Sequence, residues 1–262
     1  MTTPASIDYS LNEDVAIIRL NNPAALNAIS NRMGLELNDA LDRAAREARA
    51  VVLGSHGRAF SAGADLTAGD VDLTDPQRDM GLFLDKVFNP MIRRLRDLPV
   101  PLVTAVRGAA AGVGCAIALM GDAIVAGRSA YFLQAFCNIG LVPDGGSAYL
   151  LARTIGRVRA MELMLFGERF PADRAYEAGL VTRLVDDGEV DGMALELARK
   201  AARGPTRALS LIRRSAWAAL ESSLDDQLEL ERRLQREAGR TDDFVEGVDA
   251  FIEKRPPKFT GR

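Results

Sequence analysis

Two loops rich in small residues are the parts of this sequence most suited to chemistry. One spans residues 108–115, after a β-rich run at 101–106, and the other spans 57–66, after an apolar run at 51–55. Small side chains leave backbone N–H groups uncovered, and such groups at a helix start attract a negatively charged oxygen. Two of these donors on one carbonyl oxygen form an oxyanion hole. The same small residues also suit tight packing of a helix on a sheet, so both interpretations stay open at this point.

Composition limits the classes of protein that this chain can be. The 262 residues are 48% hydrophobic, enough for one large domain with an appendage. The net charge is -3, and the sequence contains no block of like charge, which argues against a nucleic-acid partner. Cys115 and Cys137 lie among apolar residues, and the N-terminal residues do not resemble a secretory signal. The longest apolar run, 109–121, is too short to span a bilayer, so we expect a cytoplasmic protein without membrane partners.

Hydrophobic periodicity predicts an α/β chain that becomes purely helical near its end. Residues 67–75 are polar and aperiodic and are expected to be mobile. The repeated strand-strand-helix units suggest small sheets wound into a spiral. The predicted strands are 7–10, 15–20, 51–55, 102–106, 123–126, 131–133 and 181–185. The predicted helices are 30–48, 76–98, 114–120, 145–154, 157–166, 171–178, 193–202, 205–221, 224–238 and 242–253.

Three blocks of the sequence resemble those of a known family. Residues 59–66, 108–115 and 139–146 are similar, in order and spacing, to the signature blocks of the enoyl-CoA hydratase/isomerase (crotonase) superfamily. The resemblance extends from about residue 8 to residue 262, and residues 88–95 and 239–262 look most like the ring-epoxide isomerases of phenylacetate degradation. It implies a crotonase-like spiral core over 1–200 and a helical trimerisation region over 201–262. Homotrimers or dimers of trimers are the implied assembly.

The resemblance also implies where substrate binds. The N–H groups of Ala64 and Val113 would hold a thioester oxygen, although Val113 replaces the glycine usual in the family. Asp65 is expected to brace its loop or to meet the adenine end of CoA. Phe251 and Lys254 would reach the CoA of a neighbouring subunit, unless they are ordinary surface residues. The implied substrate- and CoA-binding residues are Ala25, Leu26, Ala62, Asp65, Leu66, Gly112, Phe136, Phe251 and Lys254.

The acidic residues of the family hydratases are missing from this chain. Two separated proton transfers during hydration call for two glutamates, and the corresponding positions hold Ala116 and Phe136. Asp144 remains, and a single carboxylate suffices to move a proton between two carbon atoms. The alternative for Asp144 is a cap on the following helix.

Other polar residues are assigned structural roles. His56, the only histidine, is expected to be a solvated turn residue, and Asp122 a turn or capping residue. The sequence contains no cluster with metal-ligand spacing and no complete dinucleotide fingerprint. We therefore expect no metal and no permanently bound cofactor, with CoA entering as part of the substrate.

These observations predict an isomerase of acyl-CoA thioesters. It would shift a double bond or convert a ring epoxide to an oxepin, using an oxyanion hole and one aspartate base. Two alternatives remain: a 2-enoyl-CoA hydratase, which is a lyase of fatty-acid or aromatic-acid degradation, and a non-catalytic acyl-CoA-binding protein.

Overall fold

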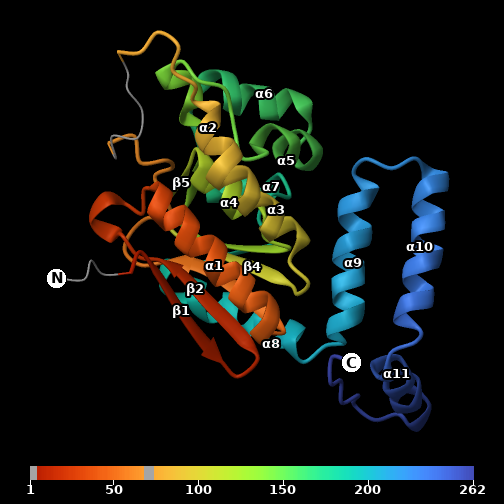
Figure 1. The fold of residues 1–262 in the computed structure, drawn as a ribbon. Coiled ribbons are helices and arrows are strands. Elements are labelled where there is room, and N and C mark those ends of the chain that lie inside the picture. Colours follow the sequence, from red (N-terminus) through yellow and green to blue (C-terminus); the bar gives the residue numbers. More distant parts are fainter. Residues whose placement is uncertain (1–4, 68–73) are drawn as a thin grey trace.

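The inner strands of the large sheet, above all β3 and β4, are buried on both faces, whereas the edge strands β1 and β9 are partly exposed. The computed structural model describes residues 5–67 and 74–262 (Figure 1). The strand order is β1-β2-β3-β4-β6-β9, with β1 antiparallel to β2 and the other neighbours parallel. The strands are β1 (Ile7–Asn12), β2 (Val15–Leu20), β3 (Ala50–Ser55), β4 (Leu102–Val106), β6 (Ala123–Gly127) and β9 (Arg183–Val185).

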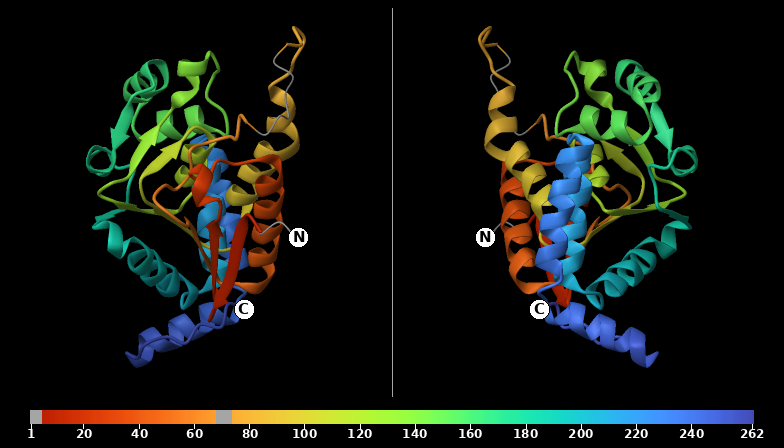
Figure 2. Two further views of the ribbon diagram at one scale, coloured as in Figure 1. Left: turned by 90° about the vertical axis from the view of Figure 1, so that its left-hand side faces the viewer. Right: turned by 90° about the vertical axis from the view of Figure 1, so that its right-hand side faces the viewer.

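Helices cover both faces of this sheet (Figure 2). Along β3, Val51 and Leu53 face a core shared with α1 and α3, whereas Val52 faces a second core formed with α8. A strand that is buried on both faces carries apolar residues at consecutive positions, which explains the apolar sequence of residues 50–53. The helices up to this point are α1 (Asn31–Glu47), α2 (Gly81–Phe83), α3 (Asn89–Asp97), α4 (Val113–Leu119), α5 (Ser147–Thr154), α6 (Arg157–Phe166), α7 (Ala172–Glu177) and α8 (Val190–Ala202).

A second, three-stranded sheet continues the spiral beside the first. Its order is β5-β7-β8, with β5 parallel to β7 and β7 antiparallel to β8. Its strands are β5 (Ala109–Ala111), β7 (Tyr131–Leu133) and β8 (Arg169–Pro171). Short turns of other helix types connect these parts: η1 (Pro23–Ala25), the π-helical η2 (Leu84–Phe88), η3 (Ala135–Ile139) and η4 (Asp187–Glu189).

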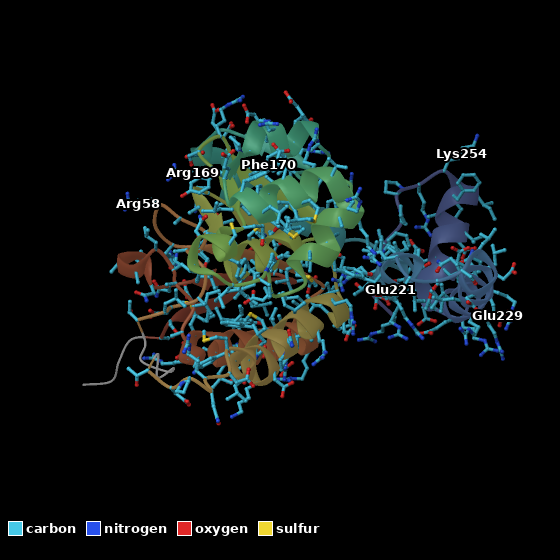
Figure 3. The ribbon with its side chains drawn as sticks, turned by 90° about the horizontal axis from the view of Figure 1, so that it is seen from above. Arg58, Arg169, Phe170, Glu221, Glu229 and Lys254 are labelled. Carbon is cyan, nitrogen blue, oxygen red and sulfur yellow. The ribbon has the colours of Figure 1, made fainter. Side chains whose placement is uncertain are left out.

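The C-terminal helices form an arm beside the core. They are α9 (Thr206–Ala219), α10 (Leu224–Ala238) and α11 (Asp242–Glu253). Seen from above, Glu229 and Lys254 lie at the far end of this arm, and Glu221 lies nearer the core (Figure 3). The arm leaves large apolar side chains exposed, including Leu224 at 73% and Phe251 at 85%. The predicted boundary between domains 1–200 and 201–262 falls near the end of α8, and it stays a prediction.

Arg213 attaches α9 to the core. Its Nε donates to Asp122 Oδ2 at 2.6 Å, and its other nitrogens donate to the carbonyl oxygens of Leu95 and Leu98 at the end of α3. A cavity of about 570 Å³, with Arg213 in its lining, lies between α9 and the helices α3 and α5. Its lining reaches Gly146 but includes no residue of the loops 57–66 and 108–115, so this cavity is not formed by those loops.

Several predicted boundaries were wrong. The helix predicted to begin at residue 76 begins at Gly81. The carboxylates of Asp75 and Asp79 each accept a hydrogen bond from the N–H group two residues later in the chain, and these bonds stabilise turns in place of the first helical turns. The short strands β5 and β8 were not predicted, and the helix predicted from 171 begins at Ala172. The mobility predicted for 67–75 concerns mainly residues 68–73, which lie outside the described residues. Among the described helices, none is both long and apolar enough to cross a membrane.

Candidate active site

The two loops of small residues run side by side. Ser61 and Ala110 form a parallel β-bridge, in which the Ser61 N–H donates to Ala109 O at 2.9 Å and the Ala111 N–H donates to Ser61 O at 2.9 Å. The same alignment lets the Phe60 N–H donate to Arg107 O at 2.7 Å. The backbone pairing therefore holds the two loops next to each other.

Two glycines mark the point of closest approach. A Cβ built on Gly63 would lie 3.7 Å from Gly112 Cα and 3.0 Å from Ala111 O. Gly63 has φ +100° and Gly112 has φ +51°, conformations that L side chains rarely adopt. Space and backbone conformation thus both favour glycine here, and Ala64 and Val113 follow immediately on the two chains.

The N–H groups of Ala64 and Val113 are unused within the described part of the chain. The bridge between Ile29 and Ala64 uses the N–H groups of Ile29 and Asp65 and not that of Ala64. Val113 is the first residue of α4, where an N–H has no partner within the helix. Two free donors follow the paired glycines, an arrangement suited to holding one carbonyl oxygen.

Asp144 lies in a turn that packs against α4. A Cβ on Gly145 would lie 2.7 Å from Ala116 Cβ and 3.5 Å from Val113 Cγ2, so the turn adjoins the residue that carries the second donor. Asp144 Oδ1 is buried without a hydrogen-bond partner in the described residues. This burial raises the pKa of Asp144 to about 6, because it disfavours the charged form.

The alternative role of Asp144 as a helix cap is wrong. Gly146 occupies the cap position of α5, and no side chain caps that helix. The helix predicted over 145–154 begins at Ser147, since Gly145 and Gly146 both have positive φ and form a turn before it. The Asp144 carboxylate is therefore not engaged by the helix.

Apolar side chains occupy the two positions at which the family hydratases would place glutamates. Ala116 is fully buried on α4 and faces the Gly145 turn. Phe136, on η3, places its ring 3.6 Å from a Cβ built on Gly112. The surroundings of the Val113 N–H thus combine apolar side chains with the turn that carries Asp144.

Comparisons with known proteins identify the family of this chain. Residues 10–262 match the family described as Enoyl-CoA hydratase/isomerase. A 1,2-epoxyphenylacetyl-CoA isomerase of Escherichia coli K12 is 44% identical over 250 residues, which are 95% of each chain. The chain belongs to the enoyl-CoA hydratase/isomerase family.

Other members of the family are close in sequence or structure. A 2,3-dehydroadipyl-CoA hydratase of Escherichia coli K12 is 34% identical over 97% of this chain and 98% of its own. A crystal structure of an enoyl-CoA hydratase from Mycobacterium smegmatis matches with a TM-score of 0.90 at 30% identity, covering 98% of this chain and 99% of that chain. The fold is therefore the crotonase fold, and the family supports activity on acyl-CoA thioesters. Both isomerases and hydratases occur among these relatives.

Several of the residues implied by the family resemblance to bind CoA lie together at one side of these donors. The Ala62 N–H donates to Leu26 O at 2.9 Å, which joins the loop carrying Ala25 and Leu26 to the second small-residue loop. Ala25 and Ala62 are exposed, and Leu66 is 63% exposed. Asp65 Oδ1 accepts from both the N–H and the hydroxyl of Thr67, so this carboxylate braces its loop. Its possible contact with adenine stays a prediction.

Phe251 and Lys254 are not brought to the site of their own chain. Lys254 lies at the end of the C-terminal arm, on the opposite side of the molecule from Arg58 of the small-residue loop (Figure 3). Phe251, three residues earlier on α11, is 85% exposed. Any contact with CoA would therefore have to come from a second copy of the chain.

The remaining polar candidates have structural surroundings. His56 Nε2 lies 3.1 Å from Asp8 Oδ2 at the surface, and Asp122 Oδ2 accepts from Leu102 N as well as from Arg213. Burial raises the pKa of Cys115 to about 12, which keeps this thiol protonated. Across residues 5–67 and 74–262, no three His, Cys, Asp or Glu side chains gather as they would around a metal ion.

Two residues near the site were missed by the sequence interpretation. Ser147 is fully buried in the first turn of α5, three residues after Asp144. Arg58 is exposed at the start of the second small-residue loop and has no ion pair within the described residues. A basic side chain in an otherwise small-residue loop was a usable signal for Arg58. Ser147 had none, because a serine at a helix start is common.

Proposed function

We propose that this protein is an isomerase of acyl-CoA thioesters. The N–H groups of Ala64 and Val113 hold the thioester oxygen, and Asp144 moves a proton from one carbon atom to another. The observation that carries the proposal is the half-buried carboxylate of Asp144, whose buried Oδ1 has no hydrogen-bond partner among the described residues and which lies in a turn packed on Val113. A base with a pKa near 6 is matched to proton transfer close to neutral pH.

The proposed reaction needs only these groups. Asp144 removes a proton from the carbon next to the thioester carbonyl, and the resulting negative charge moves onto the oxygen held by the two N–H groups. The charge then returns through the unsaturated system as Asp144 delivers the same proton to a more distant carbon. Substrate and product have the same composition. One such backbone donor typically contributes about 2.7–4 kcal/mol to the transition state.

The substrate class that fits best is a ring epoxide of a phenylacetyl-CoA type. The relative that is 44% identical bears the name 1,2-epoxyphenylacetyl-CoA isomerase. In such a substrate the ring C–C bond shared with the epoxide breaks, which expands the ring to an oxepin. Transfer of a proton from the carbon between ring and thioester to a ring carbon then moves a double bond out of the ring, and the composition is unchanged. The apolar side chains of Phe136 and Ala116 beside the donors suit a ring better than a charged group. Straight-chain 3-enoyl-CoA esters undergo the same proton transfer and are the simpler test substrates.

The remaining parts of the proposal concern CoA and assembly. The segments around Ala25, Ala62 and Leu66 contact CoA, which enters as part of the substrate, and no further cofactor takes part. Phe251 and Lys254 contact CoA bound to another subunit of a homotrimer or of a dimer of trimers. The exposed apolar side chains of the C-terminal arm support such an assembly.

Hydration of a 2-enoyl-CoA is the second candidate, because a relative at 34% identity is a hydratase. The two activities separate in an assay of crotonyl-CoA hydration against double-bond migration in a 3-enoyl-CoA. We expect migration to dominate, and Asp144→Asn to lower its kcat by about 10³-fold or more. Asp75→Asn, which alters an exposed turn carboxylate, is the control and should retain full activity. Fast hydration without migration would contradict the isomerase proposal.

A non-catalytic acyl-CoA-binding protein is the third possibility. In that case every observed turnover would survive Asp144→Asn unchanged, while binding of acyl-CoA measured by calorimetry would persist. Loss of turnover with retained binding in Asp144→Asn is the result that the isomerase proposal predicts.

A further inference from the structure

Ser147 carries a buried hydroxyl that has no evident role in the fold. The residue is 0% exposed, and its Oγ has no hydrogen-bond partner among the described residues. Buried hydroxyls are usually hydrogen-bonded, because desolvating one without a partner costs about 1–3 kcal/mol. Such a group calls for an explanation beyond packing, since alanine would fill nearly the same space without that cost.

A tight backbone turn joins Ser147 to Asp144. The Ser147 N–H donates to Asp144 O at 3.0 Å, so residues 144–147 form a hydrogen-bonded four-residue turn. Its two central residues, Gly145 and Gly146, have φ +58° and +77°, as in a type I′ turn. A turn of this kind keeps its first and last Cα atoms within about 7 Å. Asp144 Oδ1 and Ser147 Oγ are therefore two unpartnered buried polar atoms at the two ends of one turn.

Few charged groups compete for the Asp144 carboxylate. The elements packed on the turn meet it with Ala116, Val113 and Ile92, and α4 carries no charged side chain. Burial alone accounts for the raised pKa of Asp144. The ionisable groups of the adjoining α3 and α5 are Arg93 in the cavity, Arg94 paired with Asp42, Arg96 paired with Asp97, and Arg153 stacked on Tyr149.

We propose that the Ser147 hydroxyl is a positioning group that donates a hydrogen bond to Asp144 Oδ1 whenever this carboxylate is charged. The serine side chain can rotate between staggered rotamers, which changes the direction in which its hydroxyl points. The hydrogen bond stabilises the charged base between its two proton transfers and holds it facing the substrate. The inference rests on the proposed function, because it takes Asp144 as the base.

Ser147→Ala removes the hydroxyl and leaves the helix start otherwise intact. Losing a hydrogen bond to the charged form raises the pKa of a carboxyl group. We expect the acid limb of the kcat/KM profile for a 3-enoyl-CoA to move up by roughly one pH unit, about a tenfold loss at low pH, with little change at pH 8. Ser147→Thr keeps a hydroxyl and should keep the wild-type limb.

Thr104→Val is the matched control for loss of a buried hydroxyl. Thr104 is 0% exposed and donates to Ala118 O at 2.9 Å, at the other end of α4 from the two donors. This variant should lose stability yet keep the wild-type acid limb. Melting temperatures of all variants, followed by circular dichroism, identify any that fold poorly.

The outcomes separate the inference from the function on which it rests. An acid limb that stays at the wild-type pH in Ser147→Ala, or that moves equally in Thr104→Val, would overturn the role of Ser147. If Asp144→Asn abolishes turnover in the same series, the proposed base still stands. Turnover that survives Asp144→Asn would overturn the proposed function itself, whatever the serine variants show.

Discussion

Gly145 rests directly against Ala116. A Cβ added to Gly145 would lie 2.7 Å from Ala116 Cβ, closer than two such atoms approach in folded proteins. This contact fixes the turn that carries Asp144 on the helix that begins with Val113. It also leaves little room for a longer side chain at position 116, where the resemblance to the hydratases would place a glutamate. The contact that positions the Asp144 turn thus also disfavours a glutamate at position 116.

Gly145→Ala should therefore displace the base. The new methyl group meets Ala116 and has to adopt φ +58°, so we expect a loss of about 2–4 kcal/mol in unfolding free energy and a large fall in isomerase kcat. Gly179→Ala is the matched control, since Gly179 has φ +79° but open space around it. It should lose only about 1–2 kcal/mol and keep its kcat, as measured by urea unfolding and turnover. Equal kcat values in the two variants would argue against the importance of this contact.

Activity should fall as the pH drops through the pKa of Asp144. Burial raises that pKa to about 6, and only the charged carboxylate accepts a proton. We expect kcat/KM to be constant above about pH 7 and to fall close to tenfold for each pH unit below about pH 5. A stopped-time assay across this range measures the profile. An acid limb centred near pH 4 would instead indicate a base exposed to solvent.

Asp144→Asn should stabilise the protein at neutral pH while it abolishes turnover. The folded chain binds the Asp144 proton more tightly than the unfolded chain, because its pKa rises from 3.8 to about 6. Stability therefore falls as the pH rises between these values. A neutral asparagine avoids that loss, and with partial solvent exposure taken into account we expect a gain of about 1–2 kcal/mol at pH 8. The gain should shrink toward pH 4, as urea unfolding at both pH values can show.

Arg213 should matter to stability far more than its neighbour Arg214. The Arg213 side chain is 6% exposed, pairs with Asp122 and donates to the backbone carbonyls of Leu95 and Leu98. Arg213→Met leaves these groups without their partner, so we expect a loss of about 2–4 kcal/mol and a detached α9. Arg214→Met alters an exposed side chain and should change stability by no more than about 0.5 kcal/mol. Similar melting temperatures for both variants would contradict the anchoring role of Arg213.

Arg58 should contribute to binding of the CoA phosphates. Gly57, the first residue of the loop 57–66, packs on Pro23 of the loop that carries Ala25. This contact places Arg58, which has no ion pair within the described residues, beside the proposed CoA-binding segments. Arg58→Ala should raise KM about threefold to tenfold at low salt with little change in kcat. Arg169→Ala, whose guanidinium stacks on Tyr131, is the control and should leave KM unchanged. A KM that does not respond to Arg58→Ala at any ionic strength would exclude a phosphate contact.

The sequence alone determined the nature of the donors and of the acid. The glycines and alanines of the two loops, and the absence of glutamate at positions 116 and 136, are readable from the order of residues. So is the fold class, because strands buried on both faces need long apolar runs and amphipathic helices need a period of 3.6 residues. Local patterns of this kind depend only on neighbours along the chain.

Only the tertiary structure decided which polar groups lack partners. That Asp144 is unpartnered rather than a helix cap, and that Ser147 is buried beside it, depends on the turn formed by Gly145 and Gly146 against Ala116. The strand β5 likewise forms because Ala109–Ala111 pair with Tyr131–Leu133, which lie 22 positions later in the sequence. Burial and long-range pairing are set by segments distant in the sequence, and they determine the pKa of a carboxylate whose type the sequence already specifies.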